Sequence, residues 1–261
     1  METKENKLIF KMSYNVDLVL CMDATNSMRP LLDMVKDNAL NLYDDLMRKA
    51  NSMEPRMPID SFRIRLIAFR DYRDNGEEAM CATDFMTMPG QKQEFKTVVD
   101  GISPKGGGDI PEDALEALAF AIRSEWKKAD RMSKNRQIIV LWTDSPPHTL
   151  GYCRTLEKGG RNKDYPDNMP GSFAELTDWW GTPNSQYNYM DQRGKRLIIY
   201  GPKKETVLKN MNQAEIDSSM DWCKIEKAMN HTVLVESIAG QGLREHQYET
   251  ILNTIMSTIA D

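Results

Sequence analysis

Val16-Asp-Leu-Val-Leu-Cys-Met22, followed directly by Asp23-Ala-Thr25-Asn-Ser27, is the stretch of sequence that decides the fold. Its first part is short, mostly apolar and bounded by polar residues, which predicts a buried strand. After Met28 the apolar residues recur at steps of three and four, and this spacing predicts a helix packed on the sheet over 28–47. A buried strand that leads into an amphipathic helix is typical of the first unit of a parallel α/β sheet.

The same alternation continues along the chain. Apolar runs predict further strands over 62–69, 79–86, 137–142, 196–200 and 232–236, and helical spacing predicts helices over 91–102, from Pro111 onward and over 248–259. Asp74-Asn-Gly76 has turn chemistry suited to a hairpin, which makes 79–86 an antiparallel edge strand. We therefore expect an α/β fold over 1–261, a single domain with a doubly wound, mostly parallel six-stranded sheet and helices on both faces.

The segment 149–194, here called the insertion, interrupts this alternation after the fourth predicted strand. It is poor in aliphatic residues and rich in Gly, Pro, Asn, Asp and aromatic residues. Ser172-Phe-Ala-Glu175 has the spacing of a capping box and predicts a short helix through Trp179 and Trp180. A loop of this length is either a folded excursion or a binding element.

Charge and composition exclude several classes of protein. The chain carries 34 Lys and Arg against 39 Asp and Glu, a net charge of −5, without the basic stripe that nucleic-acid binding needs. No apolar run approaches the ~20 residues that span a bilayer, so no membrane partner is expected. The first fifteen residues are charged and show no signal peptide, and the four cysteines form no CxxC pair. We expect reduced thiols and a cytoplasmic location.

Carboxylates follow two of the predicted strands directly, and they indicate a metal site. Asp23 follows the first strand and Asp144 follows the strand over 137–142. If these strands are neighbours where the strand order reverses, both carboxylates converge there with the hydroxyls of Thr25 and Ser27. Such oxygen ligands suit a divalent cation, Mg²⁺ first, with Mn²⁺ or Ca²⁺ as alternatives. The simpler alternative is local capping, in which Ser27 caps a helix that begins at Met28.

The pattern Asp23-x-Thr25-x-Ser27 resembles the DxSxS motif of the von Willebrand factor A domain family, with threonine in place of one serine. The loop Lys105-Gly-Gly-Gly-Asp109 and the strand end Leu141-Trp-Thr-Asp144 resemble two further motifs of that family, in the same order. The forms GGGDIPED and TDSPPH look most like the domains that accompany alpha-type kinases. The resemblance covers nearly the whole chain. It implies a Rossmann-like domain whose metal-ion-dependent adhesion site (MIDAS) binds a divalent ion and captures an acidic side chain of a partner protein.

Asp109 departs from the family pattern, because most members have threonine there. One interpretation is that Asp109 is a third carboxylate ligand, which would tighten metal binding but make the ion less attractive to an acidic side chain of a partner. The other is that Asp109 caps the helix that follows and never touches the metal.

Several residues near the predicted site are candidates for partner binding. They lie on the loop after the second strand, on the proline-rich loop after Asp144 and in the insertion: Arg70, Asp71, Tyr72, Arg73, His148, Tyr152, Trp179 and Trp180. The alternatives are a solvated turn for the first four, an ordinary surface histidine, and a satellite core for the tryptophans.

These observations favour a non-catalytic, metal-dependent protein-interaction module, acting as a scaffold or regulatory subunit of a cytosolic multiprotein complex. A metal-assisted hydrolase with His148 as the base is the first alternative. A structural metal with recognition through the insertion is the second.

Overall fold

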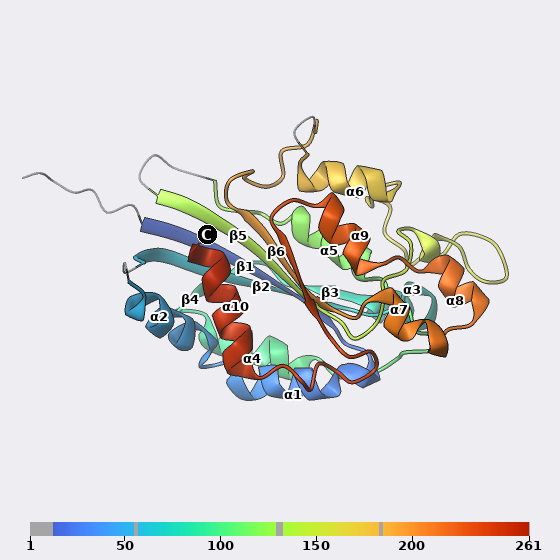
Figure 1. Cartoon of the computed structure of the whole chain (residues 1–261), viewed down its shortest axis with the longest axis horizontal. Helices are drawn as coiled ribbons and strands as arrows, with labels where there is room; N and C mark the ends of the chain where they lie inside the picture. Colours follow the sequence, from blue (N-terminus) through green and yellow to red (C-terminus); the bar gives the residue numbers. More distant parts are fainter. Residues whose placement is uncertain (1–12, 55–56, 129–132, 183–184, 261) are drawn as a thin grey trace, which may run out of the picture.

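The computed structural model describes residues 13–54, 57–128, 133–182 and 185–260 of the chain. These residues fold into one mostly parallel sheet with helices on both faces (Figure 1), which confirms the predicted α/β class. Residues 1–12, which carry most of the segment used to predict the absence of a signal peptide, lie outside the described residues. No helix within the described ranges is both long and apolar enough to cross a bilayer.

Seven strands make up the sheet of the described residues, in the order β3-β2-β1-β5-β6-β7, with β4 also paired to β2. β1 runs parallel to β2 and β5, and β6 and β7 continue the parallel part, whereas β3 and β4 are antiparallel to β2. The strands are β1 (Ser13–Asp23), β2 (Ile59–Phe69), β3 (Met80–Ala82), β4 (Met86–Met88), β5 (Ser133–Trp142), β6 (Lys195–Gly201) and β7 (Thr232–Glu236).

The predicted edge strand over 79–86 is two short strands, so the predicted count of six strands is wrong by one. The hydroxyl of Thr83 accepts a hydrogen bond from the backbone N–H of Leu66 at 3.0 Å, in the place of a backbone carbonyl. A side chain that competes for the ladder in this way ends the regular pairing. The chain resumes pairing with β2 only at Met86.

Helices cover each face of the sheet around its own apolar core. One core lies under α1, α2, α4 and α10, and the other under α5, α6 and α9. The helices are α1 (Arg29–Asn38), α2 (Leu42–Ser52), α3 (Tyr72–Asn75), α4 (Lys92–Gly101), α5 (Ala114–Ile122), α6 (Phe173–Trp180), α7 (Lys204–Val207), α8 (Gln213–Ser218), α9 (Trp222–Ala228) and α10 (Tyr248–Ala260), with 3-10 turns η1 (Asn26–Met28), η2 (Gly76–Ala79), η3 (Tyr152–Arg154) and η4 (Leu208–Asn210).

Two helix boundaries differ from the prediction. The helix predicted over 28–47 is interrupted between α1 and α2, where the Asn38 side chain donates to the carbonyl of Met34 at 2.8 Å. Asparagine side chains that bind the backbone compete with helix continuation. α5 begins at Ala114 rather than at Pro111, because Glu112 is extended and bonds through its N–H to the carbonyl of Pro146 in the loop after β5.

The insertion packs against the second core through α6. Ser172 accepts a hydrogen bond from the backbone N–H of Glu175, as the capping-box spacing predicts. Leu176, Trp179 and Trp180 are all buried in the core that also contains α5. α6 is therefore part of the packed structure, and its aromatic pair contributes to that packing.

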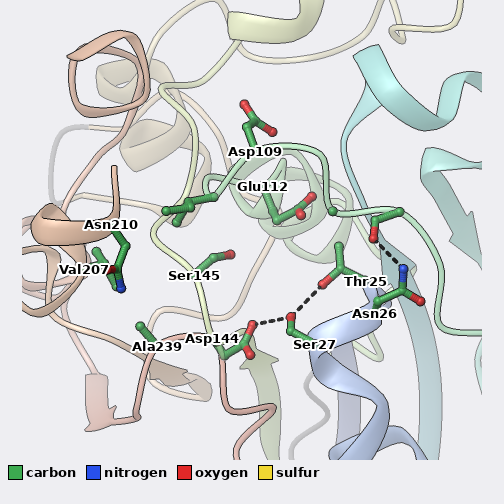
Figure 2. Close-up of a pocket in the computed structure, with 14 residues that line it drawn as sticks. Thr25, Asn26, Ser27, Asp109, Glu112, Asp144, Ser145, Val207, Asn210 and Ala239 are labelled. Atoms are coloured by element: carbon green, nitrogen blue, oxygen red, sulfur yellow. Dashed lines mark hydrogen bonds between the residues drawn. The ribbon is translucent and has the colours of Figure 1, made fainter. Parts of the chain in front are cut away.

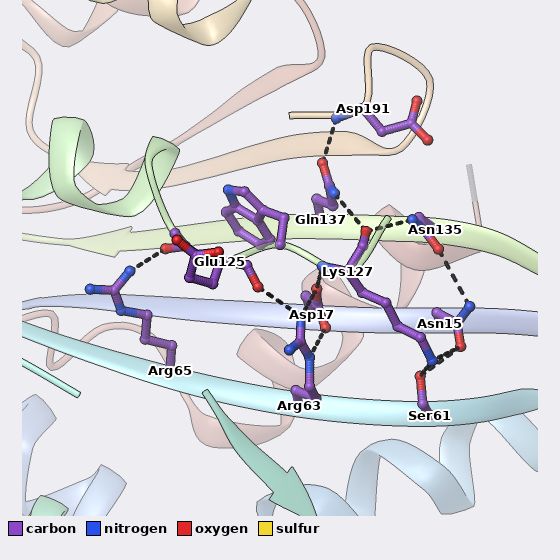
Figure 3. A network of polar contacts seen from close by, with 12 residues as sticks. Asn15, Asp17, Ser61, Arg63, Arg65, Glu125, Lys127, Asn135, Gln137 and Asp191 are labelled. Carbon is purple, nitrogen blue, oxygen red and sulfur yellow. Dashed lines mark hydrogen bonds and ion pairs between the residues drawn. The ribbon is translucent and has the colours of Figure 1, made fainter. Parts of the chain in front are cut away.

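A buried polar network joins the ends of β1, β2 and β5 that lie opposite to the predicted metal site (Figure 3). Asp17 on β1 accepts two hydrogen bonds from Arg63 on β2, at 2.7 and 2.6 Å, and one from the N–H of Lys127 at 2.7 Å. Such bidentate pairs are strongly directional. The network fixes the alignment of β1 with β2 and with the chain that follows α5.

Candidate metal centre

The carboxyl ends of β1 and β5 lie side by side, as the metal-site prediction requires. The two strands pair in parallel up to Met22 and Trp142, and the sheet order reverses between them, because β2 lies on one side of β1 and β5 on the other. Asp23 ends β1, and Asp144 lies two residues beyond the end of β5. The structure therefore brings the two carboxylates to the topological switch point, where ligands of doubly wound sheets bind.

Four side chains form a continuous chain of oxygen atoms at this point. Thr25 donates to Asp23 Oδ1 from its backbone N–H at 2.9 Å and from its hydroxyl at 2.6 Å. The hydroxyls of Thr25 and Ser27 lie 3.3 Å apart, and Ser27 donates to Asp144 Oδ1 at 2.9 Å (Figure 2). Ser27 lies inside η1, and its hydroxyl points to Asp144. The capping alternative for Ser27 is therefore wrong.

The second oxygen of each carboxylate, Asp23 Oδ2 and Asp144 Oδ2, accepts a hydrogen bond from a neighbouring loop. Thr143 donates from its hydroxyl to Asp23 Oδ2 at 2.8 Å, and the backbone N–H of Gly242 donates to Asp144 Oδ2 at 2.7 Å. Hydrogen bonds of this kind orient the carboxylates that ligate a metal. The sequence contains no signal for Gly242, which lies 98 residues further along the chain than Asp144.

Burial makes this pair of carboxylates costly without a counter-charge. Burial, with Asp144 as a second cause, raises the pKa of Asp23 to about 7. The pKa of Asp144 is also raised by burial. Hard oxygen donors that face one another in a buried place are the donor set that divalent cations such as Mg²⁺ prefer. The residues present therefore fit a divalent cation.

A cavity of about 300 Å³ opens above these oxygens, and Glu112 lies in its wall. Only 3% of Glu112 is exposed, and its Oε2 has no hydrogen-bond partner among the described residues. Burial and the charge of Asp23 raise its pKa well above its usual range. Glu112 is not among the residues predicted for the site, although it follows Asp109 by only three positions in the sequence, and both line the cavity.

Asp109 lines the same cavity and does not cap α5. The N-cap residue of α5 is Asp113, so the capping alternative for Asp109 is wrong. Asp109 Oδ2 lies 3.5 Å from His148 Nε2, and burial raises the pKa of the Asp109 carboxyl to about 6. Its coordination of a metal stays a prediction.

Most of the residues predicted to bind a partner are buried, which corrects that prediction. Arg70 donates to the backbone carbonyls of four residues that surround it, Ala24, Glu78, Ser103 and Lys105. Asp71, Tyr72, His148, Trp179 and Trp180 are also buried. Arg73 and Tyr152 are partly exposed and contact one another, with the guanidinium 3.7 Å from the ring centroid. The tryptophans are buried for packing, but they lie in the second main core of the sheet and not in a separate satellite core.

Comparison with known proteins gives a family and a fold. A family model described as the von Willebrand factor A domain matches residues 17–149, about half of the chain. The alpha-protein kinase vwkA of Dictyostelium discoideum is 22% identical over 260 residues, which cover 92% of this chain but only 38% of that protein. The chain thus spans well under half the length of this relative.

Two solved structures of the pilus adhesin SpaC from Lactobacillus rhamnosus GG share the fold. One has a TM-score of 0.52 at 13% identity and covers 95% of this chain and 31% of the adhesin. The other, an open conformation, has a TM-score of 0.51 at 14% identity, with 95% and 30% covered. At this identity the likeness concerns the fold alone.

Proposed function

The chain belongs to the von Willebrand factor A domain family, and from that premise we propose that it is a metal-dependent protein-interaction module. The family supports an interaction module in general. The metal dependence rests on one observation, the chain of oxygen atoms from Asp23 through Thr25 and Ser27 to Asp144, which faces a cavity.

The cation of this proposal is Mg²⁺. The hydroxyls of Thr25 and Ser27 and the carboxylate of Asp144 would hold it, with Asp23 and Asp109 as the further carboxylates of the predicted set. When bound, the ion supplies a positive charge that faces the cavity and a position for an oxygen ligand from outside. Asp23 orients Thr25 through two hydrogen bonds, which keeps the threonine hydroxyl beside that of Ser27.

The partner of this proposal is a protein that presents an acidic side chain to the ion. The wall of the cavity supports it, because burial and the charge of Asp23 raise the pKa of Glu112, which disfavours a further negative charge there. Asp23 and Asp144 then balance the charge of a divalent ion, and Asp109, as a third carboxylate, would make the ion less attractive to an acidic ligand.

We also propose that the module is non-catalytic and works in a cytosolic complex, as a scaffold or regulatory subunit. The hydrolase alternative needs His148 as a base, but His148 is fully buried and is not among the described residues that line the cavity. All four cysteines of the chain lie in described ranges and are free thiols, including the exposed Cys81, which supports a reducing compartment.

Calorimetric titration of Mg²⁺ into the metal-stripped chain tests the proposal. We expect one binding site, and we expect Asp144→Asn and Ser27→Ala to weaken it by at least about 10–100-fold, the loss seen when even an outer partner of a metal site is removed. Asp84→Ala is the matched control, because Asp84 is exposed, lies between β3 and β4 and is not among the described residues that line the cavity. Equal binding by all four proteins, or binding by none, would contradict the proposal.

A further inference from the structure

Four buried side chains with metal-binding atoms lie together outside the cavity wall. Asp71 precedes α3, Asp113 precedes α5, His148 follows β5, and Cys153 lies in η3 of the insertion. One ligand atom from each lies within 4.8 Å of the others. None of the four is among the described residues that line the cavity above Asp144. The cluster therefore shares no residue with the strand-end site, although His148 Nε2 lies 3.5 Å from Asp109 Oδ2 in the cavity wall.

The distances within the cluster suit a small ion with four ligands. Asp71 Oδ2 lies 2.9 Å from His148 Nε2 and 3.3 Å from Cys153 Sγ. In a tetrahedral zinc site with its usual bond lengths, ligand atoms lie about 3.3–3.8 Å from one another. The observed separations, up to 4.8 Å, bracket that range, so small side-chain movements suffice to close the site.

Within the cluster the thiol of Cys153 donates to Asp71 Oδ2, but Asp113 and His148 present buried polar atoms without hydrogen bonds among the described residues. His148 Nε2 nevertheless lies 2.9 Å from Asp71 Oδ2, so those two groups already attract one another, and Asp113 Oδ1 and His148 Nδ1 are the atoms left without a hydrogen bond among the described residues. Leaving such groups unsatisfied in the interior is costly, and a cation at their centre would remove that cost.

The remaining polar atoms of these residues are fixed by the backbone. Asp71 Oδ1 accepts from the N–H of Arg73 and Asp74, and Asp113 Oδ2 accepts from the N–H of Tyr72 at 2.8 Å. The backbone N–H of His148 donates to the carbonyl of Glu112 at 2.9 Å. Each carboxylate thus has one oxygen held by the backbone and the other turned to the cluster, which is how outer hydrogen bonds orient metal ligands.

The charge of the cluster also calls for a cation. Burial and neighbouring carboxylates raise the pKa of Asp113 and of the Cys153 thiol above their usual values. Glu116, likewise buried, adds a further carboxyl that repels Asp113. A bound dication would offset this concentration of acidic groups.

We propose that Asp71, Asp113, His148 and Cys153 bind a structural Zn²⁺ ion. A thiolate, an imidazole and carboxylates are zinc ligands, whereas Mg²⁺ and Ca²⁺ take oxygen ligands. Four protein ligands in the interior leave no open position, which is typical of a structural site and not of a catalytic one. The ion replaces the thiol proton of Cys153, which passes to solvent. It links the loop after β2, the start of α5 and the start of the insertion.

Cobalt substitution of the metal-stripped chain tests this proposal, because thiolate-bound Co²⁺ has a characteristic charge-transfer absorption. We expect the band to appear at one equivalent of Co²⁺ and to disappear when Zn²⁺ is added. Cys153→Ser should lose the band. Cys223→Ser, a half-buried cysteine outside the cluster, should keep it. No band in the unmodified chain, or a band that survives in Cys153→Ser, would overturn the proposal.

A second variant keeps the test decisive if Cys153→Ser fails to fold. In Asp71→Asn the amide oxygen can keep both backbone hydrogen bonds at the start of α3, so circular dichroism should be unchanged. We expect its Zn²⁺ affinity to fall by at least about tenfold. Unchanged Zn²⁺ affinity in a folded Asp71→Asn would overturn the proposal. Asp144→Asn should keep the cobalt band, which separates this site from the strand-end site, so either proposal can fail alone.

Discussion

Asp23 accepts three of the strand-end hydrogen bonds, two from Thr25 to one oxygen and one from Thr143 to the other. Because both of its oxygens accept hydrogen bonds, Asp23 shapes the loop even without a cation. Its charge in the interior is nevertheless costly, and this cost depends on pH.

The raised pKa of Asp23 predicts that the metal-free chain becomes less stable as the pH rises. The carboxyl titrates near 4 in the unfolded chain and at about 7 in the folded chain. Between these values the folded state binds a proton that the unfolded state has lost, so this contribution to stability is full below about pH 4 and is lost by about pH 7. Thermal unfolding without metal, from pH 5 to 7, measures the slope.

Asp23→Asn is the control for this slope, because it removes the titrating group and keeps the size of the side chain. Other carboxyls titrate over the same range, so the difference between the two proteins is the quantity that counts. We expect the melting temperature of the unmodified chain to fall with pH relative to Asp23→Asn. Parallel curves would contradict the prediction.

Gly242 has no room for a side chain, so we expect its replacement by alanine to disturb the metal site. Its φ is +59°, and a Cβ atom would lie 2.2 Å from the carbonyl oxygen of Ser27. We expect Gly242→Ala to displace η1 and to weaken Mg²⁺ binding about tenfold or more, since the N–H of Gly242 also holds Asp144.

Gly159→Ala is the matched control, measured in the same calorimetric titration. Gly159 also has a positive φ, +83°, but nothing lies within 4 Å of a Cβ built there, and it is not among the described residues that line the cavity. Both variants carry the backbone cost of about 1–2 kcal/mol, and only Gly242→Ala carries the clash. Equal Mg²⁺ affinities of the two variants would contradict a role for Gly242 in the site.

At the scale of elements, the sequence predicts the strands well and their interruptions poorly. The central strands are continuous apolar runs, because both faces of a parallel sheet are covered, and β1, β5 and β6 are buried along most of their length. The end of β3 at Thr83 and the break after Asn38 depend on single side-chain hydrogen bonds to the backbone, which periodicity does not contain.

The residues of the candidate site likewise divide into those that the sequence predicts and those that it does not. Asp23 and Asp144 are predictable because they follow strands that a parallel sheet aligns. The burial of Asp71, Tyr72 and His148 is not predictable in this way, because it depends on the insertion folding back over the loop after β2. The hydrogen bonds of Arg73 to the carbonyls of Tyr152 and Thr155 show this folding back.

Lys195 on β6 binds the C-terminal end of α6, and its replacement tests how much this contact stabilises the fold. Its ammonium group is buried and donates to the carbonyls of Trp180 and Gly181, at the C-terminal end of α6, and to the side chain of Gln192. Lys195→Met leaves two carbonyls without this charged donor, so we expect unfolding in urea to show a loss of about 2–4 kcal/mol.

Lys203→Met is the control for Lys195→Met, because Lys203 is a surface lysine paired with Glu236. Surface ion pairs contribute little to stability, so this variant should unfold almost as the unmodified chain does. A similar loss of stability in both variants would mean that the effect comes from removing a lysine charge and not from losing the contact of Lys195 with the end of α6.

At the scale of the whole molecule, Mg²⁺ binding to the folded state predicts a shift in unfolding. At a free Mg²⁺ concentration of about 100 times Kd, the free energy of unfolding should rise by about 2.7 kcal/mol. We expect calorimetric melts to shift upward with Mg²⁺ in the unmodified chain and in Asp84→Ala. In Asp144→Asn, whose Kd is expected to be about 10–100-fold higher, the rise at the same Mg²⁺ concentration should fall to about 1.4 kcal/mol or less, and an undiminished rise would mean that Mg²⁺ binds elsewhere.

The same variants separate recognition at the metal from recognition through the insertion. Tyr189 is an exposed aromatic of the insertion that stacks on Tyr187 and also contacts the ring of Trp179. Tyr189→Ser changes the surface of the insertion, and near-ultraviolet circular dichroism checks that the buried tryptophans stay packed. If the ion captures the partner, capture by the immobilised chain requires Mg²⁺, fails in Asp144→Asn and persists in Tyr189→Ser. The reverse result is that capture is lost in Tyr189→Ser and persists in Asp144→Asn. It would assign recognition to the insertion and leave the strand-end ion a purely structural role. A metal that only stabilises the fold changes the melting temperature without changing which partner is bound.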